Sequence, residues 1–265
     1  MPIDAAVVSA HLADAFIAAP GTTLRREDHQ KVAELVGFLR EIEAVAPPLR
    51  GENGKGRRRP PFVLVDAAAG KSALGLLAAK LLFAPAQQPM RVVVVERDPE
   101  RLLAAREAAE RLRLPSCVEV AFAASDLSGP NPIPTGASLV VALHACGAAS
   151  DAVIARAIEA DVRRLLLAPC CVGPTLPAFA AALERAAKLG FPSQAPVRQR
   201  FARAFLDAER TLVLEAAGYE TVVAPFVAPT ISPENLLWRA RRVREPGRMR
   251  EASDRLARLR GGAPA

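Results

Sequence analysis

The sequence predicts an α/β fold with a mostly parallel, doubly wound sheet. From residue 61 onward, short apolar runs of strand length alternate with longer segments of helical periodicity. Apolar runs without polar alternation indicate strands that helices cover on both faces, which is typical of parallel sheets. Of the 265 residues, 51% are hydrophobic, which is enough for the core of one large domain.

The N-terminal part is predicted to be a helical extension, residues 1–60. Residues 3–18 and 24–45 have the pattern of two amphipathic helices. In the second, apolar side chains recur at helical spacing, at Val32, Leu35, Val36, Phe38, Leu39 and Ile42. Residues 46–61 are rich in proline, glycine and charge, which indicates a basic linker or mobile loop.

Five strands with intervening helices follow the linker. The strands are predicted at 62–66, 91–98, 117–126, 138–147 and 163–172. The helices are predicted at 71–83, 99–114, 150–161, 175–190 and 198–217. Pro99 suits the first turn of its helix, and Ser150 is a candidate N-cap.

The last strands are predicted to pair with each other. Residues 220–227 and 235–243 form a candidate closing hairpin with TISPE in its loop. The main domain is therefore expected to span residues 61–243. A basic tail, residues 244–265, follows and is expected to contain a short helix.

Positive charge is concentrated in two flanking segments. The net charge is +7, but residues 50–60 alone carry +4 and residues 239–265 carry +6. A basic surface can follow the phosphates of RNA, either rRNA or tRNA. The alternative is a general abundance of arginine and alanine in the chain.

Composition also restricts the compartment. No apolar run reaches the roughly 18 residues of a membrane span. The N-terminal segment has no basic region typical of a signal peptide, so we expect a cytoplasmic protein without membrane association. The four cysteines, Cys117, Cys146, Cys170 and Cys171, are too few to indicate a disulfide framework. Oligomeric state is not indicated.

A turn of small residues follows the first predicted strand. Ligands of open α/β sheets bind at the carboxyl ends of the strands. Here Ala67, Ala68 and Ala69 precede Gly70, which can adopt a positive φ before a helix with free N–H groups. The three-glycine dinucleotide fingerprint is absent, and close packing of helix on strand also explains small residues.

Acidic residues end the next two strands. Glu96 can accept both ribose hydroxyls of an adenosine-containing ligand, with Asp98 as a nearby alternative. Either acid can instead open the following helix. Asp126 can meet an adenine amino group or form an Asx turn. Together with the small-residue turn, these acids predict an adenosine-ligand site.

Histidine and cysteine residues follow the fourth and fifth strands. LHACG contains His144 and Cys146, and APCCV contains Cys170 and Cys171. Zinc binding is disfavoured, because adjacent cysteines rarely both ligate one tetrahedral ion and no CxxC is present. A nucleophilic thiolate and the packing of small buried thiols both stay open.

Three segments together resemble a family of S-adenosylmethionine-dependent methyltransferases: VDAAAGKSALGLLAAKLL, VALHACGAASDAVI and LLLAPCCV. Members have a D-x-G-x-G-K-G cofactor turn, an LHxCGxxSD segment and a PCC segment. The family includes methyltransferase-like and rRNA-adenine-dimethylase-domain-like proteins. The tRNA ribose 2′-O-methyltransferases are similar. The resemblance covers residues 61–175, with a weaker match in ISPENLLWRARR.

The resemblance implies a Rossmann-like, seven-stranded methyltransferase sheet and S-adenosylmethionine as cofactor. Asp66, Gly70 and Lys71 match the cofactor turn, Glu96 the ribose acid, and His144 and Cys146 the segment after strand four. The chain departs from the motif at Ala67 and Ala69, where glycine is frequent, and at Ser72.

We therefore expect an enzyme that moves a methyl group from S-adenosylmethionine to a macromolecular acceptor, with RNA favoured. The candidate catalytic residues are His144 and Cys146. Histidine can position the acceptor or remove its proton, or it can be a structural turn residue. RNA cytosine-5 methyltransferases have a Pro–Cys motif after strand four, whereas the Pro–Cys pair here follows strand five. The alternatives are a non-catalytic module that binds RNA or protein, and an enzyme acting on a protein or small molecule.

Overall fold

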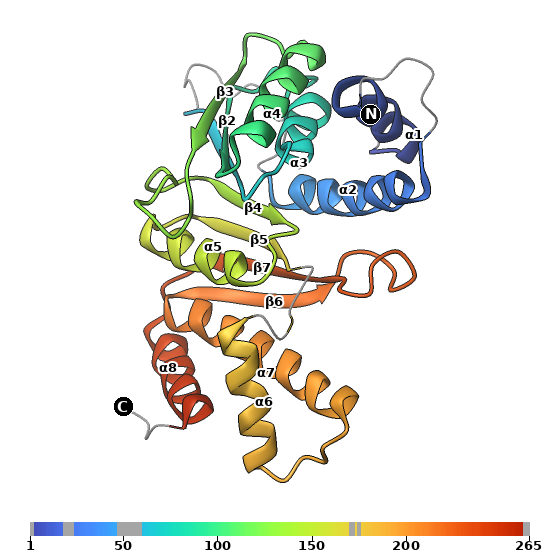
Figure 1. Cartoon of the computed structure of the whole chain (residues 1–265). Coiled ribbons are helices and arrows are strands. Elements are labelled where there is room, and N and C mark those ends of the chain that lie inside the picture. Colours follow the sequence, from blue (N-terminus) through green and yellow to red (C-terminus); the bar gives the residue numbers. More distant parts are fainter. Residues whose placement is uncertain (1–2, 18–23, 47–59, 170–172, 174–175, 262–265) are drawn as a thin grey trace.

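Seven strands form one sheet in the order β3-β2-β1-β4-β5-β7-β6 in a computed structural model (Figure 1). The structure describes residues 3–17, 24–46, 60–169, 173 and 176–261. The strands are β1 (Phe62–Ala67), β2 (Met90–Glu96), β3 (Val118–Ala124), β4 (Leu139–Leu143), β5 (Arg164–Ala168), β6 (Tyr219–Pro225) and β7 (Leu236–Arg242). The predicted α/β fold with a seven-stranded sheet is confirmed.

Strands β1 to β5 are parallel, and β7 is antiparallel to both β5 and β6. Asp66 pairs with Val94 of β2 and Val141 of β4 in register. The carboxyl ends of the parallel strands therefore meet at one edge of the sheet, which is where ligands of this fold class bind. The predicted closing hairpin is β6 and β7.

Helices cover both faces of the sheet. The helical elements are α1 (Ala5–His11), η1 (Leu12–Ile17), α2 (Arg26–Val45), α3 (Ala73–Ala78), η2 (Ala79–Phe83), α4 (Pro99–Leu112), α5 (Ala148–Glu159), α6 (Pro177–Lys188), α7 (Ala195–Ala216) and α8 (Pro246–Arg260). Helices α2, α3 and α4 pack on one face, and α5 and α7 pack on the other. No helix among the described residues is long and apolar enough to cross a membrane.

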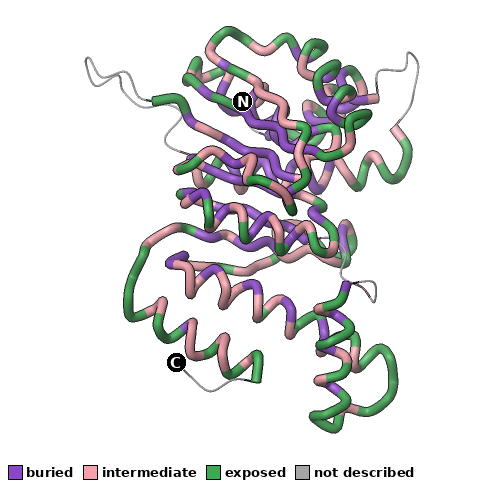
Figure 2. The backbone as a smooth tube through the Cα atoms, turned by 60° about the vertical axis from the view of Figure 1, so that its left-hand side comes forward, coloured by how far each residue is buried: buried purple, intermediate pink, exposed green. Residues whose placement is uncertain are grey.

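The core is built by alternate residues of the same strands. Leu64 and Val92 face the α2–α3–α4 side, while Val65 and Val93 face the α5–α7 side. Because both faces are covered, the strands need apolar residues at every position, which explains their unbroken runs. Burial of each such side chain contributes about 1.5–3 kcal/mol. Figure 2 shows that buried residues concentrate in the strands and the inner helix faces.

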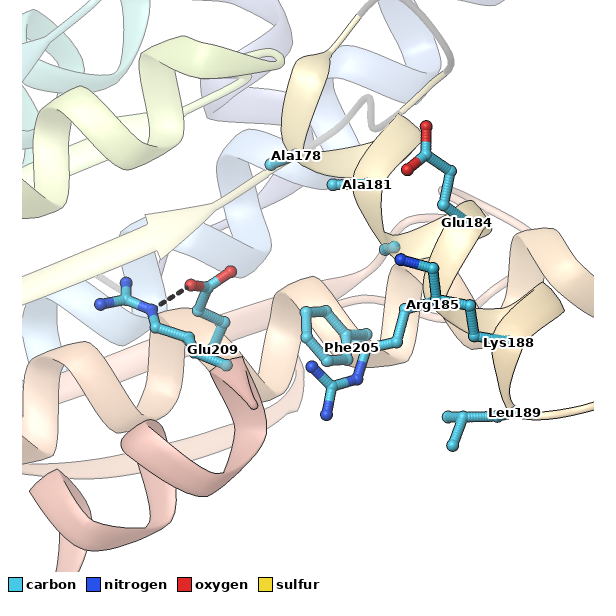
Figure 3. A pocket seen from close by; sticks show the side chains of 10 residues that line it. Ala178, Ala181, Glu184, Arg185, Lys188, Leu189, Phe205 and Glu209 are labelled. Atoms are coloured by element: carbon cyan, nitrogen blue, oxygen red, sulfur yellow. Dashed lines mark hydrogen bonds and ion pairs between the residues drawn. The ribbon is translucent and has the colours of Figure 1, made fainter. Parts of the chain in front are cut away.

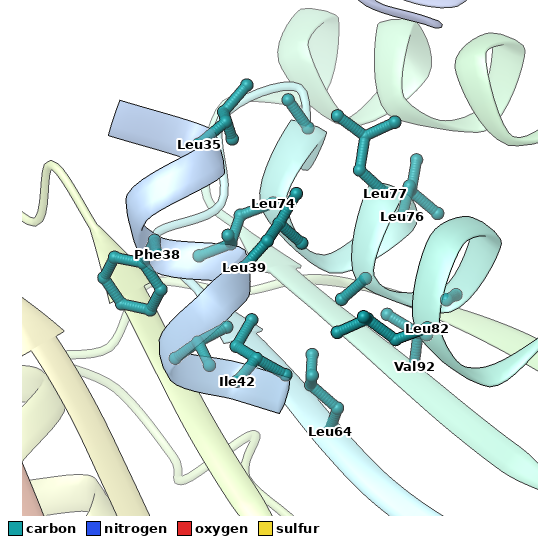
Figure 4. Close-up of a cluster of buried hydrophobic side chains, with 14 of the residues drawn as sticks. Leu35, Phe38, Leu39, Ile42, Leu64, Leu74, Leu76, Leu77, Leu82 and Val92 are labelled. Atoms are coloured by element: carbon teal, nitrogen blue, oxygen red, sulfur yellow. The ribbon is translucent and has the colours of Figure 1, made fainter. Parts of the chain in front are cut away.

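Helix α2 is part of the main core. Its side chains Leu35, Phe38 and Leu39 are almost fully buried and belong to the same cluster as Leu64 of β1 and Leu74 of α3 (Figure 4). Glu41 of α2 also forms a bidentate ion pair with Arg239 of β7, with both N···O distances at 2.6 Å. The N-terminal helices are therefore packed against the sheet.

Several predicted boundaries change for local reasons. The helix expected over 3–18 is α1 followed by the π-helical turn η1. The prediction that Ser150 caps its helix is wrong. Gly147, with φ +58°, is the N-cap, and the buried Ser150 hydroxyl donates to the carbonyl of Ala145. The tail helix α8 has 15 residues and is longer than expected. Most of the predicted linker, residues 47–59, lies outside the described residues.

Candidate functional site

A cavity of about 490 Å³ lies at the carboxyl edge of the sheet. It brings together four of the predicted site residues: Glu96 after β2, Asp126 after β3, and His144 and Cys146 after β4. The other lining residues are Ala68, Val95, Arg97, Arg101, Ser125, Leu127, Ser128, Ala148, Ala149 and Ala152. Asp66, Gly70 and Lys71 do not line it: Asp66 lies near the end of β1, and Gly70 and Lys71 lie in the turn that follows.

The turn after β1 has a left-handed residue at every second position. The φ angles are +54° at Ala68, +57° at Gly70 and +55° at Ser72. In D-x-G-x-G-K-G, these are the three positions that the motif gives to glycine. The prediction that Ala67 and Ala69 replace the glycines is therefore wrong. Left-handed backbone costs a non-glycine residue about 1–2 kcal/mol, so Ala68 and Ser72 hold this turn under strain.

Asp66 stabilises the turn after β1 through two hydrogen bonds. Its Oδ2 accepts hydrogen bonds from the Ser72 hydroxyl at 2.8 Å and the Gly75 N–H at 2.9 Å. Burial raises the pKa of Asp66 to about 7, although these two hydrogen bonds oppose the shift. Ser72 is thus kept in its left-handed conformation by a buried partner. The structure places Asp66 where it shapes the cofactor turn.

Glu96 joins the turn to the end of β2. Its Oε2 accepts from the Gly70 N–H at 2.7 Å, and its Oε1 accepts from the Asp98 N–H at 3.0 Å. Asp98 itself caps α4, because its Oδ1 accepts from the N–H groups of Glu100 and Arg101. The helix-opening alternative is therefore confirmed for Asp98, while Glu96 lies at the cavity wall.

Asp126 combines the two roles that its sequence context allowed. Its Oδ1 accepts from both the N–H and the hydroxyl of Ser128 at 2.8 Å, which is an Asx turn. The same residue lines the cavity. These hydrogen bonds, with a smaller contribution from Arg97, hold the pKa of the exposed Asp126 carboxyl below its usual value. The carboxylate is therefore a fixed acceptor at the rim of the cavity.

Lys71 is exposed directly after Gly70. Burial lowers the pKa of Lys31 on α2, and the neighbouring Lys71 charge lowers it further. Helix α2 therefore brings a second lysine toward the cofactor turn, from a part of the chain that the predicted site did not include.

His144 contacts a buried carboxylate that the sequence prediction missed. Its Nε2 lies 2.9 Å from Oε2 of Glu34 on α2, whose side chain is only 5% exposed. Burial alone would raise the pKa of Glu34, but hydrogen bonds from His144 and two other polar side chains hold it below its usual value. The available signal was a lone acid inside the apolar stretch 32–39. His144 has φ +66°, so its backbone is held in a restricted conformation.

The cysteines do not form a buried thiol cluster in the described part of the chain. Cys146 is exposed and disulfide-bonded, which the low cysteine count did not suggest. Cys117 is free and half-buried. Cys170 and Cys171 lie outside the described residues. Within the described ranges, no group of three or more His, Cys, Asp or Glu residues could hold a metal ion.

A family model described as a methyltransferase domain matches residues 30–173, which is more than half of the chain. The chain belongs to this methyltransferase family. The matched region begins in α2 and ends just after β5, so it contains Glu34 as well as the cavity residues. The predicted methyltransferase class is confirmed, with S-adenosylmethionine as the cofactor of the domain. A comparison with curated proteins finds no match.

Solved methyltransferase structures have a similar fold. The Synechocystis PCC 6803 magnesium protoporphyrin IX methyltransferase with bound SAH is 16% identical, with coverage of 90% of this chain and 99% of that chain and a TM-score of 0.48. The human methyltransferase 10 domain containing protein is 11% identical, with coverage of 91% and 95% and a TM-score of 0.44. The Pyrococcus abyssi tRNA (uracil-54, C5)-methyltransferase is 12% identical, with coverage of 79% and 38% and a TM-score of 0.41.

Proposed function

We propose that this methyltransferase modifies RNA, with S-adenosylmethionine held between Glu96 and Asp126 and the acceptor atom beside His144. The observation that supports this proposal is the cavity itself. It places acids suited to an adenosine ligand in the same cavity as a histidine that contacts a buried carboxylate. Cavities in which a few polar side chains converge between apolar walls are typical of ligand-binding and active sites.

The residues of the cavity fit an adenosyl group. Each carboxylate oxygen has two lone pairs, and each oxygen of Glu96 accepts one backbone N–H. Each therefore retains a lone pair for a ribose hydroxyl. Val95 and Leu127 supply apolar walls for a flat base, and Asp126 supplies an acceptor at the rim. A volume of about 490 Å³ is within the range of small-ligand sites.

The protein contributes positioning and proton handling. When bound, S-adenosylmethionine supplies the methyl group to the acceptor. His144 directs Nε2 at Glu34, so Nε2 carries the hydrogen of a neutral ring and Nδ1 is left as the acceptor nitrogen. Nδ1 can then take the proton of an RNA hydroxyl or amine as it is methylated. Glu34 acts through His144 and is a positioning residue. Cys146 contributes to the wall of the cavity beside it.

Charge supports RNA as the acceptor, although less of the basic flank is available than its sequence suggests. Arg239 pairs with Glu41, Arg241 with Glu220, and Arg242 with Asp161. These arginines stabilise β7. Helix α8, in contrast, has five arginines and two acids on the surface of the molecule. The basic segment 50–59 lies outside the described residues, and its role in RNA binding stays a prediction.

Replacement of Glu96 tests the cofactor site. Glu96→Ala should weaken S-adenosylmethionine binding by about 1.5–3 kcal/mol, the scale of hydrogen bonds to a charged group. Isothermal titration calorimetry measures this change. Asp98→Ala is the matched control, because Asp98 caps α4 and should alter stability while the cofactor affinity stays the same. Equal affinities for wild type and Glu96→Ala would reject the assignment.

The acceptor is tested separately. Purified enzyme and radiolabelled S-adenosylmethionine are incubated with total RNA and with total protein from cells that lack this chain. We expect label in RNA that disappears with His144→Ala. Label confined to the protein fraction would reject an RNA acceptor and leave the methyltransferase assignment intact.

A further inference from the structure

We infer that a groove between α6 and α8, with α7 as its floor, is a docking site for single-stranded RNA. The inference rests on the proposed RNA acceptor. The groove has a volume of about 610 Å³ and is separate from the cofactor cavity, with which it shares no lining residue. Figure 3 shows its side chains.

Three helices form the groove. Leu189 follows α6, whose last turn contributes Arg185 and Lys188. Helix α7 contributes Phe205 and Glu209, and α8 contributes its last residue, Arg260. Helices α6 and α7 have their own small hydrophobic cluster, apart from the two clusters of the sheet: Leu176, Phe179, Ala182, Ala202 and Leu206. The groove is therefore on a structural unit that extends beyond the sheet (Figure 1).

The groove combines an aromatic ring with basic side chains. The Arg185 guanidinium carbon lies 5.4 Å from the centre of the Phe205 ring. Lys188 is exposed and, among the described residues, forms no ion pair or hydrogen bond. Leu189 beside it is 60% exposed. Aromatic rings that stack with bases, next to cations that meet phosphates, are the features of proteins that bind single-stranded nucleic acids.

The lining of the groove has a surplus of one positive charge, because three cations face the two acids Glu184 and Glu209. Glu209 is neutralised by Arg260, whose Nε lies 2.7 Å from Oε1. Glu184 is exposed on α6. The remaining cations of the lining are Arg185 and Lys188, since the one α8 arginine that lines the groove, Arg260, pairs with Glu209. An acidic peptide would satisfy these charges but would leave the Arg185 guanidinium plane over Phe205, and the exposed Leu189, without the flat partner that a base provides. We therefore commit to RNA.

The experiment uses the full-length protein and a fluorescein-labelled oligouridylate of about 20 nucleotides. Arg185→Gln/Lys188→Gln removes two cations. Because each neutralised phosphate of a single strand contributes about 0.7 to the salt dependence of log K, the slope should fall by about 1.4. The affinity at 0.1 M salt should fall by about 25-fold. Lys188→Gln alone changes only an exposed side chain and should give about half of the effect on the slope.

Arg106→Gln is the matched control. Arg106 lies over Phe122 with its guanidinium carbon 4.5 Å from the ring centre, so the same kind of contact is removed near the opposite edge of the sheet. We expect unchanged RNA affinity for Arg106→Gln. The affinity for S-adenosylmethionine should be unchanged in this variant and in both groove variants. The groove inference is wrong if wild type shows salt-dependent RNA binding that the groove variants retain in full. It is also wrong if the groove variants keep RNA binding and lose only the binding of polyglutamate, the probe for an acidic peptide. If wild type binds no RNA at all, the proposed acceptor fails as well.

Discussion

Strain in the cofactor turn is a property of single residues. Ala68 occupies a left-handed position, whereas its neighbour Ala69 does not. We expect Ala68→Gly to raise the free energy of unfolding by about 0.5–1 kcal/mol. Relief of about 1–2 kcal/mol of strain exceeds the entropy that glycine adds to the unfolded chain. Chemical denaturation measures the change.

Ala69→Gly is the control for this prediction. Ala69 has an ordinary φ, and its N–H donates to the carbonyl of Val95 at 3.0 Å. The same change of side chain should therefore lower stability by a few tenths of a kcal/mol up to about 1. A loss of stability in both variants would show that Ala68 is not strained.

Asp66 predicts a dependence of stability on pH. Its pKa is raised from 3.8 to about 7 by burial, so the folded state binds a proton that the unfolded state has released. The contribution of Asp66 to stability is therefore fully present below pH 3.8 and is lost as the pH rises to about 7. Asp66→Asn should be more stable than wild type above pH 7, with a flatter profile between these limits. Thermal unfolding across the pH range measures the stability of both proteins. If the stability of wild type and of Asp66→Asn changes with pH in parallel, the role of Asp66 is contradicted.

Glu34 is expected to act on catalysis through His144. Glu34→Gln should lower kcat by about 10- to 100-fold, because an amide no longer fixes the imidazole for proton removal. It should also shift the pH profile of kcat/KM, which a purely structural role would leave in place. Cofactor affinity should be unchanged. Glu34→Asp, which retains the charge, should recover part of the rate. The proposed role fails if kcat and the pH profile both match wild type.

The sequence predicted the residues that follow strands better than their partners. Glu96, Asp126 and His144 could be placed together at the carboxyl edge of the sheet, because their strands are continuous apolar runs with clear ends. Glu34 could not, because its partner is 110 positions away and no local pattern links them. The left-handed positions of the turn were also missed. Alanine and serine give no local signal for positive φ, which here depends on contacts such as that of Ser72 with Asp66.

At the scale of elements, α2 is held by close approach to the loop after β6. A Cβ at Gly37 would lie 2.7 Å from Cγ1 of Val227 and 2.8 Å from the carbonyl oxygen of Phe226. Gly37→Ala should therefore destabilise the protein by about 1–3 kcal/mol, although alanine favours a helix by about 1 kcal/mol. Because α2 contains Glu34, methyl transfer should fall as well. Urea denaturation and initial rates measure both effects.

Gly247→Ala separates packing from helix propensity. Gly247 lies in the first turn of α8, and a Cβ there would meet no atom within 4 Å. Stability should be unchanged or slightly higher in this variant. A similar gain at Gly37 would show that α2 is not held by this contact.

The extents of the elements followed from periodicity, with errors at their ends. The strands agree because their apolar runs are short and bounded by polar or small residues. Ser150 was misplaced because a serine near a helix start resembles an N-cap in sequence. In the structure Gly147, with its positive φ, is the N-cap of the helix, and the buried Ser150 hydroxyl donates to the carbonyl of Ala145 in the preceding turn. The π-helical turns η1 and η2 have no distinct periodicity that the sequence could reveal.

At the scale of the whole molecule, two clusters of buried residues lie on opposite faces of one sheet, and a third lies between α6 and α7. That the sheet is mostly parallel could be predicted from the alternation of strands and helices. The groove of α6, α7 and α8 could not be predicted, because it depends on how three helices pack outside the sheet. The acids that pair with the arginines of β7 could not be predicted either, because they come from three separate parts of the chain: α2, β6 and the turn before β5.

The ion pair of Glu41 with Arg239 joins residues 198 positions apart in the sequence. During translation, α2 leaves the ribosome long before its clamp on β7 exists. A nascent chain can begin to assemble the cofactor turn and the core contacts of α2, but the ion pair that joins this helix to β7 forms only after Arg239 has emerged. Contacts between such distant segments also slow folding. Copies whose synthesis stops before β7 would therefore lack the ion pair that joins the sheet to the helix carrying Glu34.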